Sequence, residues 1–149
     1  MKKTVLMMAV LTLAASVVPA QAADRKSMMP ISAALAANDA SGRLSDSVKY
    51  YFGTQKTPKV LETLGTDKTS QKTNAVGKSD EKACNWAFLS AMLRLEKRAK
   101  DLGANAVINI VSNYKNVEFS SETEFECHAG AIMAGVALKG DFVRIEEKK

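Results

Sequence analysis

The chain has 149 residues, of which 46% are hydrophobic, and it contains two cysteines, one histidine and a formal charge of +5. This length suits one domain with a core of ordinary size and leaves no room for a second domain. Eight glycines and three prolines are too few for a collagen-like or low-complexity chain, and the hydrophobic share excludes a disordered one.

Residues 1–22 have the three parts of a secretory signal peptide. Two lysines form a positive start, an apolar run over 4–18 follows, and small residues stand three and one positions before a cleavage point after Ala22. The run of about 15 residues is shorter than the roughly 20 that a membrane-spanning helix needs, so we predict no integral membrane anchor. No cysteine follows the cleavage point to carry a lipid. We therefore expect a mature protein that is exported to the periplasm.

Export also weakens any argument for nucleic-acid binding. The signal takes two lysines from the 21 Lys and Arg residues, so 19 remain against 16 Asp and Glu, a formal charge of +3. Nucleic-acid binding needs a more concentrated basic face. The predicted long helix mixes both signs, as a solvated helix does: Arg94, Glu96, Lys97, Arg98, Lys100 and Asp101. We expect no nucleic-acid partner.

We expect a single domain over residues 47–149, preceded by an N-terminal extension over 23–46. A short Ala-rich stretch of the extension predicts one or two helical turns after Pro30. Residues 48–52 are mostly β-branched or aromatic and predict the first strand. Residues 54–79 are rich in Lys, Thr, Ser and Gly. They predict a long loop, with a helical turn in its first half and a short strand near its end.

The best-defined element is an amphipathic helix over Asp80–Leu102, ended by Gly103. Steps of three and four residues place one apolar stripe on the helix: Cys84, Phe88, Ala91, Leu95, Ala99 and Leu102. Trp86, Leu89 and Leu93 form a second apolar line roughly opposite. A helix that is apolar on two sides needs a second cover, supplied either by the N-terminal segment or by another subunit.

Three strands are predicted after the helix. Residues 106–111 are nearly all apolar, as in a central strand that is buried on both faces. Residues 117–127 alternate between apolar side chains and glutamates, and 131–138 form a last strong strand that 141–145 extends. The order β-α-β-β-β predicts an α+β fold, with one long helix packed on a mainly antiparallel sheet of four to five strands.

The two cysteines are predicted to form a structural disulfide. Cys84 lies on the helix stripe that faces the sheet, and Cys127 lies on the strand face that carries Phe125. An exported protein with one such pair is expected to oxidise it. The alternative is a free reactive thiol beside His128, but neighbours on a strand point to opposite faces. A thiol redox role is a further alternative, although the chain has no Cys-x-x-Cys motif.

His128 shares its predicted strand face with glutamates at a spacing of two residues. Imidazole and carboxylates are suitable ligands for a divalent cation. Alternate residues of one strand stand about 7 Å apart, too far for all of them to reach one ion without a neighbouring strand. We expect a solvated acidic face, and His128 with Glu126 or Glu124 as the site if the protein binds a metal.

The sequence carries no convincing catalytic motif. Residues 73–79 end in Gly-Lys-Ser before the helix, as a phosphate-binding P-loop does, but the required earlier glycine is replaced by Lys72. We interpret the segment as a turn before a helix and predict no nucleotide site. One histidine supports no Ser-His-Asp set. We therefore predict a protein with no cofactor and no enzymatic activity.

Three segments resemble a group of small exported bacterial proteins that are often labelled "excinuclease ATPase subunit". They read ACNWAFL over 83–89, RAKDLGANAV over 98–107 and EFECHAG over 124–130, and the resemblance covers residues 31–144. An excinuclease ATPase needs complete nucleotide loops and zinc-binding cysteine pairs. The sequence has neither, so the resemblance implies the family and not the activity in its label.

More distantly, residues 102–107 and the strands after them resemble two other groups. One is the YbjQ-like family, named for heavy-metal binding, and the other is the outer-membrane lipoprotein that senses envelope stress for the Rcs phosphorelay. The second resemblance implies a disulfide-braced α+β domain that works through protein contacts, although the chain lacks the lipid-bearing cysteine and a second disulfide pair. The first implies homo-oligomers that would cover the second apolar line of the helix. We expect a domain that binds a protein or envelope component, with divalent-metal binding as the alternative.

Overall fold

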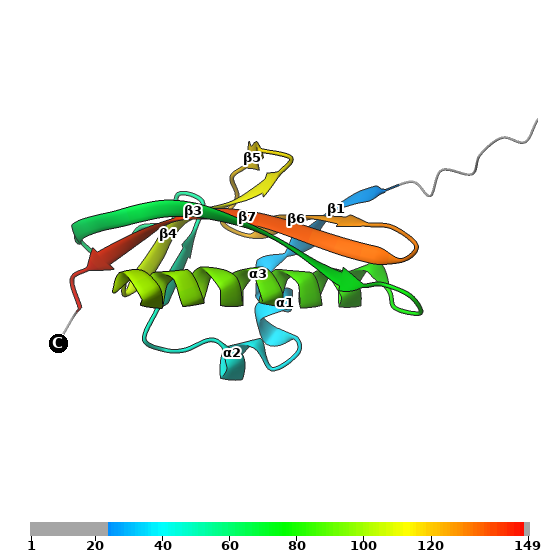
Figure 1. Ribbon diagram of the computed structural model, residues 1–149, viewed down its shortest axis with the longest axis horizontal. Helices are drawn as coiled ribbons and strands as arrows, with labels where there is room; N and C mark the ends of the chain where they lie inside the picture. Colours follow the sequence, from blue (N-terminus) through cyan, green and yellow to red (C-terminus); the bar gives the residue numbers. More distant parts are fainter. Residues whose placement is uncertain (1–23, 148–149) are drawn as a thin grey trace, which may run out of the picture.

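The computed structural model describes residues 24–147, so the predicted signal peptide lies outside the described residues. The helices lie on one side of a long twisted sheet, and a small hairpin rises on the other side (Figure 1). The predicted α+β class, with one long helix on a sheet, is confirmed. The elements in chain order are β1 (Arg25–Pro30), α1 (Ile31–Ala36), α2 (Ala40–Arg43), β2 (Lys49–Phe52), β3 (Val60–Asn74), α3 (Asp80–Leu102), β4 (Ala106–Tyr114), β5 (Val117–Phe119), β6 (Glu124–Ala129) and β7 (Met133–Ile145).

Strand β7 is the centre of the sheet. Strand β3 pairs with it along its whole length, while β4 and β6 share its other side. Strand β1 extends the sheet beyond β6, and both β2 and β5 pair with β4. The β2–β4 pair is parallel and the others described are antiparallel, which confirms a mainly antiparallel sheet. The described sheet has seven strands, so the predicted four to five was too low.

The segment predicted as a long loop is mostly the 15-residue strand β3, and that prediction was wrong. Lys, Thr, Ser and Gln fill its second half, so the sequence shows no alternation of apolar and polar side chains there. Strand β3 lies at an edge and is held by backbone pairing with β7, from Val60 opposite Ile145 to Asn74 opposite Met133. Backbone hydrogen bonds to β7 therefore keep this edge strand in the sheet, although its second half has no apolar face of its own.

The predicted strand over 117–127 is divided into two. Strand β5 pairs with β4, whereas β6 turns away to pair with β1. The Ser121 hydroxyl accepts hydrogen bonds from the backbone of Thr123 and Glu124, at 3.2 and 3.1 Å, and so stabilises the break. A side-chain hydrogen bond of this kind competes with the strand ladder.

Helix α3 has the predicted bounds. The Ser79 side chain accepts a hydrogen bond from the Lys82 backbone and caps its start, and Gly103 ends it in the left-handed conformation at φ 73°. The predicted stripe lies against the sheet, with Phe88 fully buried at 0% exposure. In the part of the chain that is described, no helix is long and apolar enough to cross a membrane.

The N-terminal segment covers the second apolar line of α3. Helix α1 follows Pro30, as predicted, and contacts α3, while Leu89 is only 1% exposed. The guanidinium of Arg43 lies 5.4 Å from the centre of the Trp86 ring, a cation–π distance. Strand β1 precedes α1 and was not predicted. Of the two predicted covers, the structure shows the N-terminal segment.

Candidate functional site: the outer face of the sheet

Alternation along β6 divides its side chains between two environments. Phe125 and Cys127 point toward α3, and each is at most 1% exposed. Glu126 and His128 point the other way, toward the side of the sheet that carries no helix. We refer to this side, formed by β3, β7, β4 and β6, as the outer face.

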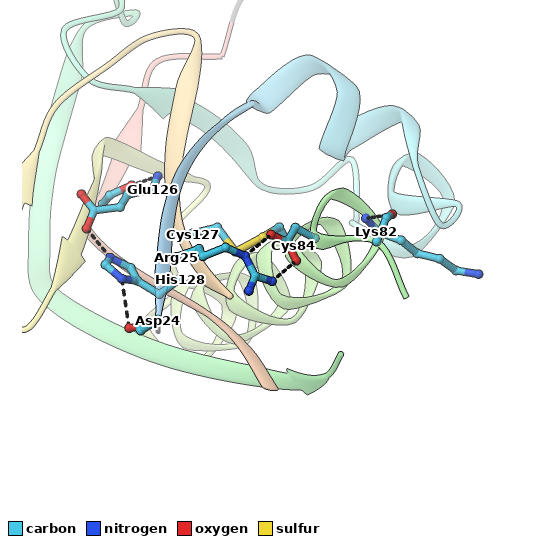
Figure 2. Close-up of a disulfide and its surroundings, with 10 residues drawn as sticks. Asp24, Arg25, Lys82, Cys84, Glu126, Cys127 and His128 are labelled. Carbon is cyan, nitrogen blue, oxygen red and sulfur yellow. Dashed lines mark hydrogen bonds and ion pairs between the residues drawn. A yellow bond between two sulfur atoms is a disulfide. The ribbon is translucent and has the colours of Figure 1, made fainter. Parts of the chain in front are cut away.

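The inward residue Cys127 forms a disulfide with Cys84, as predicted. The sulfur atoms are bonded, the two Cα atoms are 5.9 Å apart and both residues are fully buried. The bond joins α3 to β6 (Figure 2), next to Phe88 and Phe125, whose ring centres are 4.4 Å apart. The bridge therefore locks the long helix to the strand whose opposite side carries His128.

The Glu126 carboxylate points toward the outer face, where neighbouring side chains cover it and bind both of its oxygens. One oxygen is 2.6 Å from His128 Nε2, and the other is 3.0 Å from Lys26 Nζ. The side chain is only 8% exposed. Burial raises the pKa of this carboxyl, but the hydrogen bonds from His128 and Lys26 outweigh burial, so its pKa lies below its ordinary value. Glu126 is thus held as a charged, paired carboxylate.

His128 is enclosed from several directions. Its Nδ1 is 3.3 Å from a carboxylate oxygen of Asp24, on the side away from Glu126 (Figure 2). The Tyr114 ring stacks on the imidazole with ring centres 3.4 Å apart, and the Tyr114 hydroxyl donates to the same Asp24 oxygen at 2.9 Å. That hydrogen bond raises the pKa of Tyr114. The histidine is therefore oriented by two carboxylates and one aromatic ring.

The structure brings two of the three predicted metal-site residues together. Glu126 and His128 touch, but Glu124 is exposed and lies at the other end of β6, opposite Pro30. The expectation of a solvated face was wrong for Glu126 and His128, because Lys26 and Tyr114 cover them. The two ring nitrogens face different carboxylates. Within residues 24–147 no group of three or more His, Cys, Asp or Glu side chains is placed to hold a metal ion.

A groove of about 540 Å³ crosses the outer face beside this cluster. A second hollow of about 310 Å³ adjoins it and shares Lys72 and Tyr114. The groove offers ammonium, hydroxyl and amide groups and one aromatic ring, a combination suited to a polar or anionic partner. It is lined by Lys68, Thr69, Ser70, Lys72, Asn113, Tyr114, Lys115, Asn116 and Ala137.

Sequence reasoning missed most of these outer-face residues. Asp24 just before β1, Lys26 in β1 and Tyr114 in β4 lie beside His128, and nothing in their local sequence indicates that placement. A weak signal was present in β3, where Lys68, Ser70 and Lys72 recur at a spacing of two residues.

Comparison of the chain with protein-family models, with curated proteins and with solved structures finds no match. The geometry of the outer face and of the disulfide therefore provides the evidence for function.

Proposed function

We propose that the protein is an exported, non-enzymatic binding domain of the periplasm that acts by contact with a protein or another envelope component. The observation that carries this proposal is the fully buried bridge between Cys84 and Cys127. Such a bond persists in an oxidising compartment, which agrees with the signal pattern of residues 1–22. It also makes the sheet a rigid support for whatever binds to it.

The outer face supports a role in contact. Helices α1, α2 and α3 lie on one side of the sheet and leave the other side open (Figure 1). The groove and the adjoining hollow lie on this open side. Both nitrogens of His128 are engaged with carboxylates, which favours a structural role over a catalytic one.

Export is tested with a C-terminally tagged full chain that is expressed and fractionated in a Gram-negative cell. We expect a product shortened by the mass of residues 1–22, released with the periplasm, and unreactive to thiol alkylation until it is reduced. A matched variant with Ala20→Arg and Ala22→Arg should keep the full mass, because it blocks cleavage. A tagged chain that stays in the cytoplasm with reactive thiols would contradict export.

Binding is tested with a photo-crosslinker at Ser70, in the groove, and a matched one at Arg94, on the exposed side of α3. In intact cells we expect a reproducible adduct from Ser70 and none from Arg94, and mass spectrometry then identifies the captured component. Equal capture from both positions would contradict an outer-face binding site. Hydrolysis of ATP by the purified protein, abolished by Lys78→Ala, would overturn the non-enzymatic proposal.

Divalent-metal binding is the second candidate, because His128 and Glu126 bring an imidazole and a carboxylate together, although the two are hydrogen-bonded to each other at 2.6 Å. A metal would have to displace that contact, so we expect Cu²⁺, Zn²⁺ and Ni²⁺ to bind the oxidised protein no tighter than about 1 mM. Isothermal titration measures this, with His128→Gln as the comparison. Tighter binding that is lost in His128→Gln would make the metal role the better proposal.

A further inference from the structure

Bulky apolar side chains are gathered at one end of the molecule. Val76, Ile132 and Met133 are 60%, 67% and 45% exposed, and they lie in the loop after β3 and at the β6–β7 turn. The two loops touch, because the backbone of Ala75 donates to the carbonyl of Ile132 at 2.8 Å. We refer to Val76, Ile132 and Met133 as the apolar tip, at the end where the β6–β7 turn protrudes (Figure 1).

The composition of this end is unusual for a surface turn. The turn residues 130–132 read GAI, and the strand residues beside them at 129 and 133–135 are apolar as well, whereas surface turns ordinarily favour Asn, Asp, Ser and Pro as well as Gly. Single exposed apolar residues are common, but several that are adjacent mark an interaction surface. The tip therefore offers an apolar contact rather than a solvated loop.

Lysines surround the tip. Lys72 lines the same hollow as Ile132 and Met133, Lys78 follows Val76 in the loop, and Lys82 extends outward from the first turn of α3 (Figure 2). No ion pair neutralises any of these three lysines within residues 24–147. Of the two carboxylates in that turn, Asp80 is paired with Arg25 at 2.8 Å and Glu81 is exposed, so the three lysines still outnumber the remaining carboxylate.

The other end of β3 provides a contrast. Val60 and Leu61 are 37% and 60% exposed there, but the neighbouring Glu62 is acidic and pairs with Arg144. Exposed apolar residues are thus found at both ends, and the tip combines three of them with Lys72, Lys78 and Lys82. This combination is the one that binds anionic lipid, because apolar groups enter the headgroup region while lysines meet the phosphates.

We propose that the apolar tip inserts into the surface of an anionic lipid bilayer, with Lys72, Lys78 and Lys82 facing the lipid phosphates. Bilayer binding would place the outer-face groove beside the membrane, where an envelope component is reached. The inference deepens the proposed function and rests on export to a compartment that is bounded by membranes.

The test is co-sedimentation of the purified protein, its length verified by mass, with lipid vesicles. One set contains phosphatidylglycerol and phosphatidylcholine, and the other contains phosphatidylcholine alone. We expect clear binding to the anionic set and a decrease with added salt. Ile132→Ser should lower the partition coefficient by about tenfold, because the serine side chain has almost no apolar surface to bury in the bilayer. Leu61→Ser is the matched control and should bind like the parent protein.

A second pair of variants tests the charges. Lys78→Gln with Lys82→Gln should lower binding to anionic vesicles severalfold, whereas Lys59→Gln, near Leu61, should not. Circular dichroism verifies that each variant is folded. Absence of binding to anionic vesicles, or equal loss in Ile132→Ser and Leu61→Ser, would overturn the inference. Dimers in sedimentation velocity that Ile132→Ser dissolves would also overturn it, because the tip would then join two copies of this chain.

The outcome is distinguishable from failure of export. A protein that reaches the periplasm but does not bind vesicles refutes the tip inference alone. A protein that stays in the cytoplasm refutes the proposed function, whatever the vesicles show.

Discussion

Glu96 and Glu126 are charged carboxylates that the protein nearly covers. Each side chain is 8% exposed, and each is held by a lysine together with hydrogen bonds from other elements. Burial raises the pKa of Glu96, but hydrogen bonds from Lys100, Tyr50 and the Ser45 backbone bring it below its ordinary value, as partners do for Glu126. The two residues therefore make the free energy of unfolding depend on pH.

A carboxyl whose pKa is lowered in the folded state stabilises the protein above its unfolded pKa of about 4.3, and that contribution is lost as the pH falls through the folded value. We expect the free energy of unfolding to decrease below about pH 4.5. Glu126→Gln should make this decrease smaller, as measured by urea unfolding across the acid range. Glu124→Gln, an exposed neighbour on β6, should retain the parent profile. A profile that Glu126→Gln leaves unchanged would contradict this account.

Gly53 occupies a place that only glycine fits. Its φ is +56°, and a Cβ there would lie 2.9 Å from the Ser121 backbone carbon. Gly53→Ala should therefore lower the free energy of unfolding by about 2 kcal/mol or more, from both strain and collision. Gly42→Ala is the control, because no atom lies within 4 Å of its Cβ position. Thermal unfolding of the two variants measures the difference, and equal melting temperatures would contradict the argument.

At the scale of elements, the central relation is that of α3 to β6. The disulfide joins residues 43 positions apart and connects the main helix to a strand that pairs with β7 through only two residue pairs. Since β6 has so little backbone pairing with the centre of the sheet, the covalent bond and strand β1 stabilise its position.

Cys84→Ala with Cys127→Ala should lower the free energy of unfolding by about 4 kcal/mol, the chain-entropy value for a closed loop of this length. Urea unfolding measures it. A reductant should bring the parent protein close to the variant and leave the variant unchanged. A double variant as stable as the oxidised parent would show that the bridge does not stabilise the fold.

At the scale of the whole molecule, residues 24–46 are packed against the rest of the domain. Strand β1 pairs with β6 from Arg25 opposite Ala129 to Pro30 opposite Glu124. Helix α1 contacts α3, and the backbone N–H of Ser45 donates to Glu96 at 2.8 Å. The segment therefore covers both the second apolar line of α3 and the Glu126 carboxylate.

A chain that begins at residue 47 should consequently fail to fold cooperatively, because it removes Ile31 and Ala34 from the core and Lys26 from Glu126. Circular dichroism and a thermal melt measure this. The matched control ends the chain at Ile145 and removes only the residues after β7, and it should melt near the parent temperature. A truncated chain that melts like the parent would identify residues 24–46 as a dispensable extension.

Local sequence was sufficient where the determinants of an element are close together. The bounds of α3 follow from the Ser79 cap, the apolar period and Gly103, which all lie within or beside the helix. The pairing of Cys84 with Cys127 could also be predicted, because two independent periodicities point the thiols at one interior. The turn between β4 and β5 is equally local, because Lys115 and Asn116 take the positive φ of a tight hairpin turn.

Where an element depends on a distant neighbour, local sequence was insufficient. Strand β3 exists because its backbone pairs with β7, and its own side chains resemble those of a loop. The cluster around His128 combines Asp24 and Lys26 from the N-terminal segment with Tyr114 from β4, residues up to 104 positions away in the chain. Periodicity within one segment contains no information on which strand will lie beside it.

The amino-acid sequence alone was enough to predict the class of fold, the long helix and the disulfide. The fold class and the helix follow from the spacing of apolar residues, and the disulfide follows from that spacing together with the signal-like residues 1–22. Tertiary structure alone decided that β3 is a strand, that Glu126 is buried and that the apolar tip has lysines around it. These features depend on contacts between segments that are far apart in the chain, and such contacts form only when the strands are assembled beside β7.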